Sequence, residues 1–372
     1  MKILITGAYG FIGKNLSAEL KNRGFNDVLL YDRDTDEEKL KLYANECDFV
    51  FHLAGINRPK KEEEFMEGNR DFTEELTELL SGNEKRPSVL MSSSIQAELD
   101  NPYGCSKRAG ENVLLNYREK TGANVYIYRL PNVFGKWCRP EYNSVVATFC
   151  HHIANGLPIK INDPNAELSL VYIDDVVKSF IEVMNEDKKE GGDNSSWRTV
   201  PVSYKITLGE LADTICTFPE LRKNTGIPDM GNELTKKLYS TWISYLPENG
   251  FSYFLNMHED DRGSFTEFIR TPDRGQFSVN ISKPGITKGN HWHHTKNEKF
   301  LVVKGEGLIR FRKVGTEEIT EYRVSGSKLE AVDIPCGYTH SITNIGQEDM
   351  VTLMWANEAF DPENPDTFYE EV

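Results

Sequence analysis

The chain has 372 residues, 38% of them hydrophobic and 27% charged, which is enough for two domains with buried cores. Its formal net charge of −15 argues against nucleic acid or anionic membrane surfaces as partners, because both would repel the average field of the chain. No apolar run approaches the roughly 18 residues of a membrane span, and the opening segment is strand-like rather than a signal peptide, which predicts a cytoplasmic protein.

Up to about residue 215, strand-like and helical patterns alternate along the chain. Short segments rich in β-branched and apolar residues occur at 2–6, 27–32, 49–55, 88–94 and 125–130. Strands that alternate with helices build a parallel sheet covered by helices. This part of the sequence therefore predicts an α/β fold, a Rossmann-type doubly wound parallel sheet.

The pattern changes near residue 240. From about residue 250 onward, short strand-like segments such as 276–282, 298–304 and 350–356 are separated by glycine and proline turns, with almost no helical periodicity. This pattern predicts a small all-β barrel. We expect one domain over residues 1–243 and a second over residues 244–372.

A glycine-rich motif follows the first predicted strand directly and opens a helix. Glycines at these positions permit a tight turn and let a diphosphate approach the helix N-terminus, where free backbone N–H groups favour negative charge. The position after a first strand predicts a dinucleotide-binding loop. Its expected cofactor contacts are Gly7, Gly10, Phe11, Ile12 and Gly13.

Asp32 and Arg33 stand at the end of the second predicted strand and favour different cofactors. An aspartate there accepts hydrogen bonds from an adenosine ribose and disfavours a 2′-phosphate, which indicates NAD. An adjacent arginine can pair with that phosphate, which indicates NADP. These two residues alone leave both cofactors open.

The next motif combines a strand-terminal serine run, residues 92–94, with Tyr103 and Lys107. Four residues apart on a helix, Tyr103 and Lys107 share a face. A nearby ammonium favours the phenolate, so we expect Lys107 to lower the pKa of Tyr103 and make it useful for proton transfer. A serine hydroxyl, from Ser94 or Ser92, can bind the same substrate oxygen.

Together with the glycine loop, these residues resemble the extended short-chain dehydrogenase/reductase family. Three further segments are similar to that family: HLAG at 52–55, RLPNVFG at 129–135 and VYIDDV at 171–176. The resemblance spans about residues 1–240. It implies that Tyr103 transfers the proton, that Lys107 positions the nicotinamide ribose and that Ser94 binds the reacting oxygen. It adds Leu53, Ala54 and Gly55 as cofactor contacts and Asn132 as a substrate contact.

The segment GNHWHHTKNE, residues 289–298, concentrates three histidines and a glutamate. Residues two apart in a strand point the same way, so His291 and His293 can face the barrel interior together. With Glu298 and His340 they would form a mixed nitrogen and oxygen site suited to zinc. His294 faces the other way and is expected outside the ligand set.

The spacing around these residues is similar to the two motifs of the cupin (jelly-roll) family, and the neighbouring segments resemble its nucleotide-sugar 3,5-epimerase branch. In that branch the histidine matching His291 removes the proton beside a keto group, whereas here it belongs to the metal pattern. The base is therefore open among a metal-bound water or hydroxide, His294, Glu267 and Lys283. Arg262, Glu267 and Lys283 are expected to bind substrate.

Over its whole length the chain resembles capsular polysaccharide-synthesising enzymes that join a reductase to an epimerase-like cupin. The resemblance implies a UDP-2-acetamido-2,6-dideoxy-4-keto-hexose substrate, C3 epimerisation in the cupin, and NADPH-dependent C4 reduction to UDP-2-acetamido-2,6-dideoxy-β-L-talose for UDP-N-acetyl-L-fucosamine supply. It also implies one zinc ion per cupin domain and a homodimer. Two alternatives are a reductase whose barrel is only a structural dimerisation module and a non-catalytic sugar-nucleotide sensor.

Overall fold

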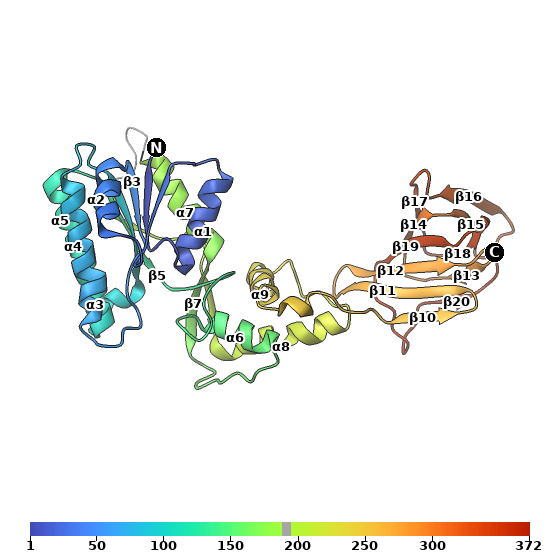
Figure 1. Cartoon of the computed structure of the whole chain (residues 1–372). Coiled ribbons are helices and arrows are strands. Elements are labelled where there is room, and N and C mark those ends of the chain that lie inside the picture. The colour runs from blue at the N-terminus through green and yellow to red at the C-terminus, as the bar shows by residue number, and fades with distance from the viewer. Residues whose placement is uncertain (188–194) are drawn as a thin grey trace. The chain divides into compact units, whose positions relative to one another are not determined.

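The computed structural model describes residues 1–187 and 195–372 of the chain (Figure 1). These residues form two compact units, each assembled from two stretches of sequence. Unit 1 comprises Met1–Ile215 with Ser240–Leu246, and unit 2 comprises Cys216–Tyr239 with Pro247–Val372. The division is not a single cut, because helices α8 (Leu208–Lys223) and α9 (Glu233–Ile243) contribute residues to both units.

Unit 1 is built on a parallel sheet with the strand order β2-β1-β3-β4-β5-β8. The strands are β1 (Ile3–Thr6), β2 (Val28–Tyr31), β3 (Phe49–His52), β4 (Ser88–Ser94), β5 (Val125–Leu130) and β8 (Trp197–Arg198). The direction in which successive strands are added changes at β1. Strand β2 lies on one side of β1, and β3, β4 and β5 follow on the other side. This arrangement confirms the predicted Rossmann-like parallel sheet.

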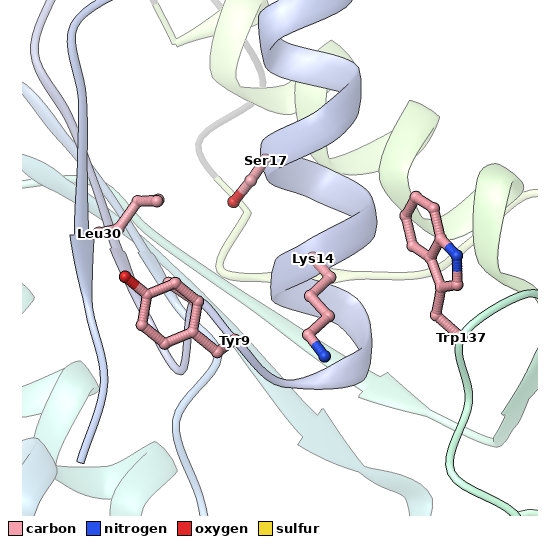
Figure 2. Close-up of a pocket in the computed structure, with 6 residues that line it drawn as sticks. Tyr9, Lys14, Ser17, Leu30 and Trp137 are labelled. Atoms are coloured by element: carbon pink, nitrogen blue, oxygen red, sulfur yellow. The ribbon is translucent and has the colours of Figure 1, made fainter. Parts of the chain in front are cut away.

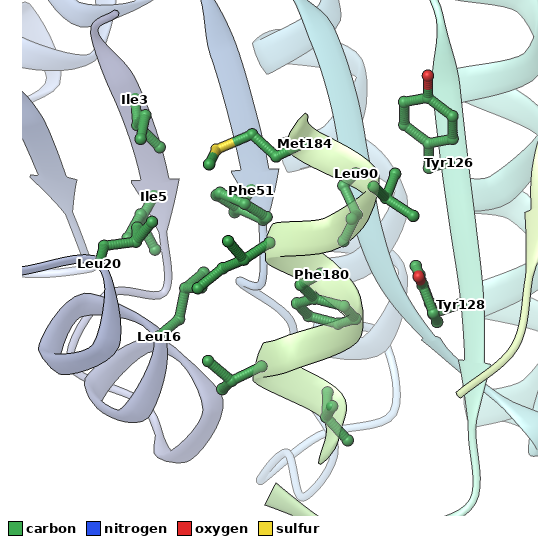
Figure 3. Close-up of a cluster of buried hydrophobic side chains, with 14 of the residues drawn as sticks. Ile3, Ile5, Leu16, Leu20, Phe51, Leu90, Tyr126, Tyr128, Phe180 and Met184 are labelled. Atoms are coloured by element: carbon green, nitrogen blue, oxygen red, sulfur yellow. The ribbon is translucent and has the colours of Figure 1, made fainter. Parts of the chain in front are cut away.

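Alternate residues of the strands feed two hydrophobic cores, one on each face of the sheet. Ile3 and Ile5 pack with Leu16 of α1 (Phe11–Asn22) and Phe180 of α7 (Ile173–Glu186), as Figure 3 shows. Leu4, between them, packs on the opposite face. That face is covered by α2 (Glu37–Glu46), α4 (Phe72–Ser81) and α5 (Pro102–Thr121). The strands are apolar along their length because helices bury both faces.

Smaller elements complete unit 1 and the segment that follows it. A second, three-stranded sheet has the order β6-β7-β9. Its strands and the remaining elements are β6 (Asn132–Phe134), β7 (Glu167–Tyr172), β9 (Tyr204–Thr207), α3 (Glu64–Met66), the π-helical η1 (Glu67–Asp71), the 3₁₀ turns η2 (Ile95–Glu98) and η3 (Glu248–Gly250), and α6 (Val145–Ala154). Within the described residues, no helix is long and apolar enough to cross a membrane.

Two antiparallel sheets form the C-terminal part of unit 2, which confirms the predicted all-β region. The first has the order β10-β11-β12-β19-β14-β17 and the second β16-β15-β18-β13-β20. The strands of the first sheet are β10 (Met257–Asp260), β11 (Gly263–Thr271), β12 (Gly275–Ser282), β14 (Glu298–Lys304), β17 (Ala331–Ile334) and β19 (Met350–Ala356). Those of the second are β13 (Thr287–Trp292), β15 (Glu306–Lys313), β16 (Ile319–Ser325), β18 (Tyr338–Asn344) and β20 (Phe368–Tyr369).

The inner faces of these sheets have an apolar part and a polar part. Val302 belongs to the hydrophobic core, and the strand register places Thr352 and Asn280 on the same face as Val302. Along β12 that face carries only polar side chains, all buried: Gln276, Ser278, Asn280 and Ser282. A row of buried polar groups next to an apolar core is typical of a ligand site rather than of packing alone.

Candidate functional site

The glycine loop of unit 1 joins β1 to α1 and depends on the absence of side chains. Gly7 has φ 68°, and a Cβ there would lie 2.7 Å from the backbone nitrogen of Ala54. A Cβ on Gly13 would lie 2.3 Å from the Gly7 carbonyl oxygen. Gly10 caps α1 without a side-chain hydrogen bond, so the first N–H groups of the helix, including those of Phe11 and Ile12, are available to an anion.

Asp32 directly follows β2 and contacts this loop. Its carboxylate accepts hydrogen bonds from the backbone N–H groups of Tyr9 and Arg33, both at 2.8 Å. The Arg33 side chain is exposed and forms no ion pair within residues 1–187 and 195–372. Both carboxylate oxygens of Asp32 are therefore engaged by the backbone, while the guanidinium of Arg33 is available to a ligand.

A surface pocket of about 590 Å³ adjoins the glycine loop (Figure 2). Lys14 and Ser17 line it from α1, Tyr9 from the loop and Leu30 from β2, and Trp137 lies on the other side of the helix. The predicted contacts Leu53, Ala54 and Gly55 follow β3, and a Cβ on Gly55 would lie 2.8 Å from Nζ of Lys107. The loop after β3 thus links the glycine loop to the serine, tyrosine and lysine group.

Ser94, Tyr103 and Lys107 come together at the carboxyl end of β4. Tyr103 lies in the first turn of α5, which Asn101 caps by accepting the N–H of Gly104 at 2.8 Å. The Ser94 hydroxyl contacts Tyr103. Lys107, one turn further along, is buried and donates from Nζ to the carbonyl oxygen of Ser92 at 3.3 Å. The structure thus places the Ser94 hydroxyl, rather than that of Ser92, beside Tyr103.

Burial governs the protonation of this group. It raises the pKa of Tyr103, and the hydrogen bond from Ser94 offsets this only in part. Burial also lowers the pKa of Lys107 to about 8, against the opposing charge of Glu111. The prediction that Lys107 lowers the pKa of Tyr103 was wrong for this arrangement, because the ammonium is held on Ser92 and the phenol is desolvated. Tyr103 is therefore a neutral phenol at neutral pH, the form that donates a proton.

We expect the rate of the C4 reduction that the resemblance implies to fall as the pH rises through about 8, where Lys107 loses its charge. Below that pH the ammonium can stabilise the developing oxyanion, and Tyr103 stays protonated on both sides because its pKa is raised. Measuring kcat/KM between about pH 6 and about pH 10 should show one descending limb. The Lys120→Met variant, which alters an exposed lysine of the same helix, should keep that limb. A flat profile would contradict the assignment.

The predicted substrate contact Asn132 begins β6 and is tied to the loop before α6. It donates to the carbonyl oxygen of Asn143 at 3.3 Å and accepts from the hydroxyl of Ser144 at 3.0 Å. In the same loop Tyr142 acts electrostatically on Tyr103, which puts the loop close to Tyr103.

Two exposed arginines, Arg58 and Arg139, flank the ring of Tyr142, with guanidinium carbons 5.6 Å and 5.2 Å from its centroid. Neither arginine forms an ion pair within the described part of the chain, although the sequence has 58 acidic residues. Two unpaired guanidinium groups near Tyr103 suit a diphosphate. Sequence reasoning missed Arg58 and Tyr142. The arginines that follow the strand-terminal motifs could have suggested Arg58, but no local pattern indicated Tyr142.

A second cluster lies in unit 2, where the structure brings together all four predicted metal ligands. One ligand atom from each of His291, His293, Glu298 and His340 lies within 4.8 Å of the others. Oε2 of Glu298 is 3.2 Å from Nε2 of His340 and 3.6 Å from Nε2 of His293. These three atoms are buried and lack well-oriented hydrogen bonds. Buried polar atoms without partners, in a set of three imidazoles and one carboxylate, fit a zinc ion.

The electrostatics of the cluster also suit a cation. Burial and the neighbouring His340 lower the pKa of His291 to about 4. Burial alone would raise the pKa of Glu298, but the neighbouring imidazoles of His293 and His340 outweigh it and hold this pKa at about 2. An ionised carboxylate among imidazoles favours a positive charge between them, which a divalent metal supplies. His294 is exposed, and its ring lies 4.6 Å from the ring of Trp292.

A β-bulge brings an unpredicted lysine to the face that carries His291. The register of β13 against β18 pairs Lys288 with Ile342 but His291 with His340, because Asn290, at φ 57°, is an extra residue. Without that bulge Lys288 and His291 would face opposite sides. The ammonium of Lys288 donates to Oδ1 of Asn280 at 2.7 Å and to the carbonyl oxygen of Ile281 at 2.9 Å.

The three residues predicted to bind substrate in this unit lie in β11 or next to the ends of β11 and β12. Arg262 and Lys283 are exposed, and Arg262 pairs with Asp260 at 2.6 Å. The carboxylate of Glu267 is paired with Arg270 at 2.7 Å. Although burial acts in the other direction, hydrogen bonds from Arg270 and Thr225 lower the pKa of Glu267, which makes it a weak base.

Residues 3–195 match the NAD dependent epimerase/dehydratase family, and residues 258–368 match the polysaccharide biosynthesis C-terminal domain. The chain is 49% identical over 368 residues to the UDP-2-acetamido-2,6-beta-L-arabino-hexul-4-ose reductase of Pseudomonas aeruginosa, covering 99% of this chain and 98% of the relative. The match thus extends through both units, including the helices α8 and α9, which contribute residues to both.

Solved structures give the same result at the level of fold. The capsular polysaccharide assembling protein CapF from Staphylococcus aureus is similar with a TM-score of 0.92 and 53% identity over 100% of both chains. The UDP-glucuronic acid 4-epimerase from Bacillus cereus, in complex with NAD, is 20% identical with a TM-score of 0.52, over 59% of this chain and 84% of that chain. The second likeness shows a shared fold alone.

Proposed function

Because the chain belongs to the family of UDP-2-acetamido-2,6-β-L-arabino-hexul-4-ose reductases, we propose that it acts twice on a UDP-2-acetamido-2,6-dideoxy-4-keto-hexose. Residues 244–372 invert C3, and residues 1–243 then reduce C4 to give UDP-2-acetamido-2,6-dideoxy-β-L-talose for UDP-N-acetyl-L-fucosamine and capsular polysaccharide synthesis. The observation that carries this proposal is the presence of two separate catalytic constellations, Ser94, Tyr103 and Lys107 in unit 1 and the histidine and glutamate cluster in unit 2.

The order of the two steps follows from the chemistry of the sugar. A proton at C3 beside the C4 keto group is acidic, because the resulting carbanion delocalises onto the C4 oxygen. Removing that proton and replacing it on the opposite face inverts C3. Reduction of C4 destroys this acidity, so inversion comes first.

For the reduction, the glycine loop and Arg33 would hold NADPH, which would supply a hydride to C4. Tyr103 donates its phenol proton to the oxyanion that develops on the C4 oxygen, and Ser94 donates a hydrogen bond to the same oxygen. The ammonium of Lys107 supplies a positive charge next to these groups, between the carbonyl oxygen of Ser92 and the loop at Gly55. Arg58 and Arg139 bind the diphosphate of the substrate, and Asn132 orients the loop that carries Tyr142.

For the inversion, His291, His293, Glu298 and His340 would hold a zinc ion, which would supply a positive charge that favours proton loss beside a carbonyl group. Lys288 is better placed to move that proton than Lys283, because it shares the inner face with His291. Burial lowers the pKa of Lys288, which makes it a more available base at neutral pH.

Two features of unit 2 support a cupin-type homodimer. Its two antiparallel sheets enclose the metal cluster, as a jelly-roll barrel does. On the outer face of the larger sheet, Val279, Leu353 and Leu301 lie in register and are partly exposed. An apolar outer face on a sheet suits contact with a second copy of the chain.

Absorbance of the reduced cofactor tests the proposed function. Adding the 4-keto sugar to enzyme and NADPH should cause the absorbance to fall, and NADH should be a poorer cofactor. Arg33→Ala should weaken the NADPH preference by about 10- to 100-fold, because a charged hydrogen bond is worth about 1.5–3 kcal/mol. Arg23→Ala, which alters an exposed arginine at the C-cap of α1, is the matched control. No absorbance change with either cofactor would contradict the reductase activity and favour a sensor.

A further inference from the structure

The last residues of the chain form the edge of the sheet that carries the metal ligands. In β20, Tyr369 pairs with His291 and Phe368 pairs with Trp292 of β13. The backbone N–H of Glu370 donates to the carbonyl oxygen of Asn290 at 3.0 Å, which extends this pairing past the bulge. The C-terminal segment 366–370 is thus in direct backbone contact with a ligand strand.

Asp366, at the start of this segment, binds the loop between the ligands His293 and Glu298. Its carboxylate accepts three consecutive backbone N–H groups, from His294 at 2.9 Å, Thr295 at 2.7 Å and Lys296 at 2.8 Å. It also accepts the hydroxyl of Thr295 at 3.1 Å. Three consecutive donors turned toward one carboxylate fix the conformation of the loop, since hydrogen bonds to an ionised acceptor are stronger than those between neutral groups.

The backbone carbonyl of Asp366 makes a second kind of contact, because it accepts a hydrogen bond from Nδ1 of His293. A donor role for Nδ1 assigns the proton to that nitrogen and leaves Nε2 with its lone pair. Nε2 is the atom that faces Glu298, at 3.6 Å. One residue therefore fixes both the path of the loop and the tautomer of a ligand.

The other end of the segment is anchored to the neighbouring strands. The carboxylate of Glu370 accepts from Nη2 of Arg312 at 2.9 Å, and its carbonyl oxygen accepts the hydroxyl of Thr339, the residue before His340. Contacts at both ends hold segment 366–370 across β13 and next to β18. The segment therefore touches the strands that carry His291 and His340 and the side chain of His293.

We propose that Asp366 is the positioning residue of the metal centre and that segment 366–370 clamps the ligands His291, His293 and His340 in a geometry ready for the ion. This inference rests on the proposed metal site. Residues outside the ligand set that orient ligands are typically worth 10- to 100-fold in metal affinity. The clamp comes from a part of the chain 72 residues from the loop that it binds.

Zinc affinity of the full-length protein, measured by competition with a chelator after metal removal and reloading, tests the clamp. Asp366→Ala should weaken the affinity by about 10- to 100-fold. Asp361→Ala is the matched control, because Asp361 also accepts a backbone N–H, from Glu363 at 2.9 Å, but not from the ligand loop. Its affinity should match that of the unaltered protein. Equal affinity of Asp366→Ala and the unaltered protein would overturn the clamp.

Asp366→Asn keeps the shape of the side chain and one strong acceptor, so it carries the test if the alanine variant does not fold. It should lose about tenfold in zinc affinity, and the visible spectrum of bound Co²⁺ should change because the ligands are held less firmly. An unchanged affinity and spectrum would overturn the clamp while the metal site stands. If the unaltered protein itself bound no zinc, both the clamp and the proposed metal site would fall.

Discussion

Replacing Tyr103 by phenylalanine is expected to slow NADPH oxidation by the 4-keto sugar about 10²- to 10⁴-fold, the usual worth of a positioned proton donor. Burial raises the pKa of Tyr103, so its phenol is protonated and ready to donate at neutral pH. The variant loses only the hydroxyl that meets Ser94, and its ring still fills the same space beside Phe65, whose centroid is 5.6 Å away. The measurement is the initial rate of absorbance loss at saturating NADPH.

Tyr43→Phe is the matched control, since Tyr43 lies in α2 and packs against a hydrophobic core rather than beside Ser94. It should reduce the sugar at the unaltered rate. The Tyr103→Phe protein should also keep its zinc content, because the metal ligands lie in unit 2. Oxidation of NADPH by Tyr103→Phe at the unaltered rate would contradict the role given to this tyrosine.

Replacing His340 by alanine is expected to abolish metal binding and to lower the rate of C3 inversion more than about a hundredfold. His340 is buried, with 1% of its surface exposed, and it supplies one of the four possible ligand atoms of the cluster. Even residues outside a ligand set are worth about 10- to 100-fold, so a ligand should exceed that range. Metal content by elemental analysis and the configuration of the product at C3 measure the two effects.

His258→Ala, an exposed histidine of β10, is the control for His340→Ala. The two proteins should reduce a 4-keto sugar already inverted at C3 at similar rates, because Ser94, Tyr103 and Lys107 are intact. If His340→Ala lost its metal but still inverted C3 at the unaltered rate, the barrel would be a structural module rather than an epimerase.

Local patterns were enough to predict several of the residues that come together at each candidate site. The glycine loop, the pair Tyr103 and Lys107, and the pair His291 and His293 depend on spacings of one turn or two strand residues, which the backbone geometry fixes. The two halves of the fold followed from the change of hydrophobic period near residue 240. Alternation along β1 likewise accounts for the two cores of unit 1.

What the sequence could not predict depends on long-range contacts or on a break in the local pattern. Lys288 reaches the inner face only through the bulge at Asn290, and a strict period of two places it outside. Asp366 meets its loop 72 residues away, and no spacing rule connects them. The pKa of Tyr103 rises because of burial, which a pattern of four residues does not reveal. The pair Gly289 and Asn290 was the one local sign of a bulge.

The most direct measurement is proton NMR of the 4-keto sugar in deuterated water, with enzyme and without NADPH. The unaltered protein and Tyr103→Phe should both exchange the C3 proton for deuterium, because inversion precedes reduction and uses the other unit. His340→Ala should leave that proton in place over the same period. Exchange by all three proteins, or by none, would contradict the assignment of C3 inversion to the histidine and glutamate cluster.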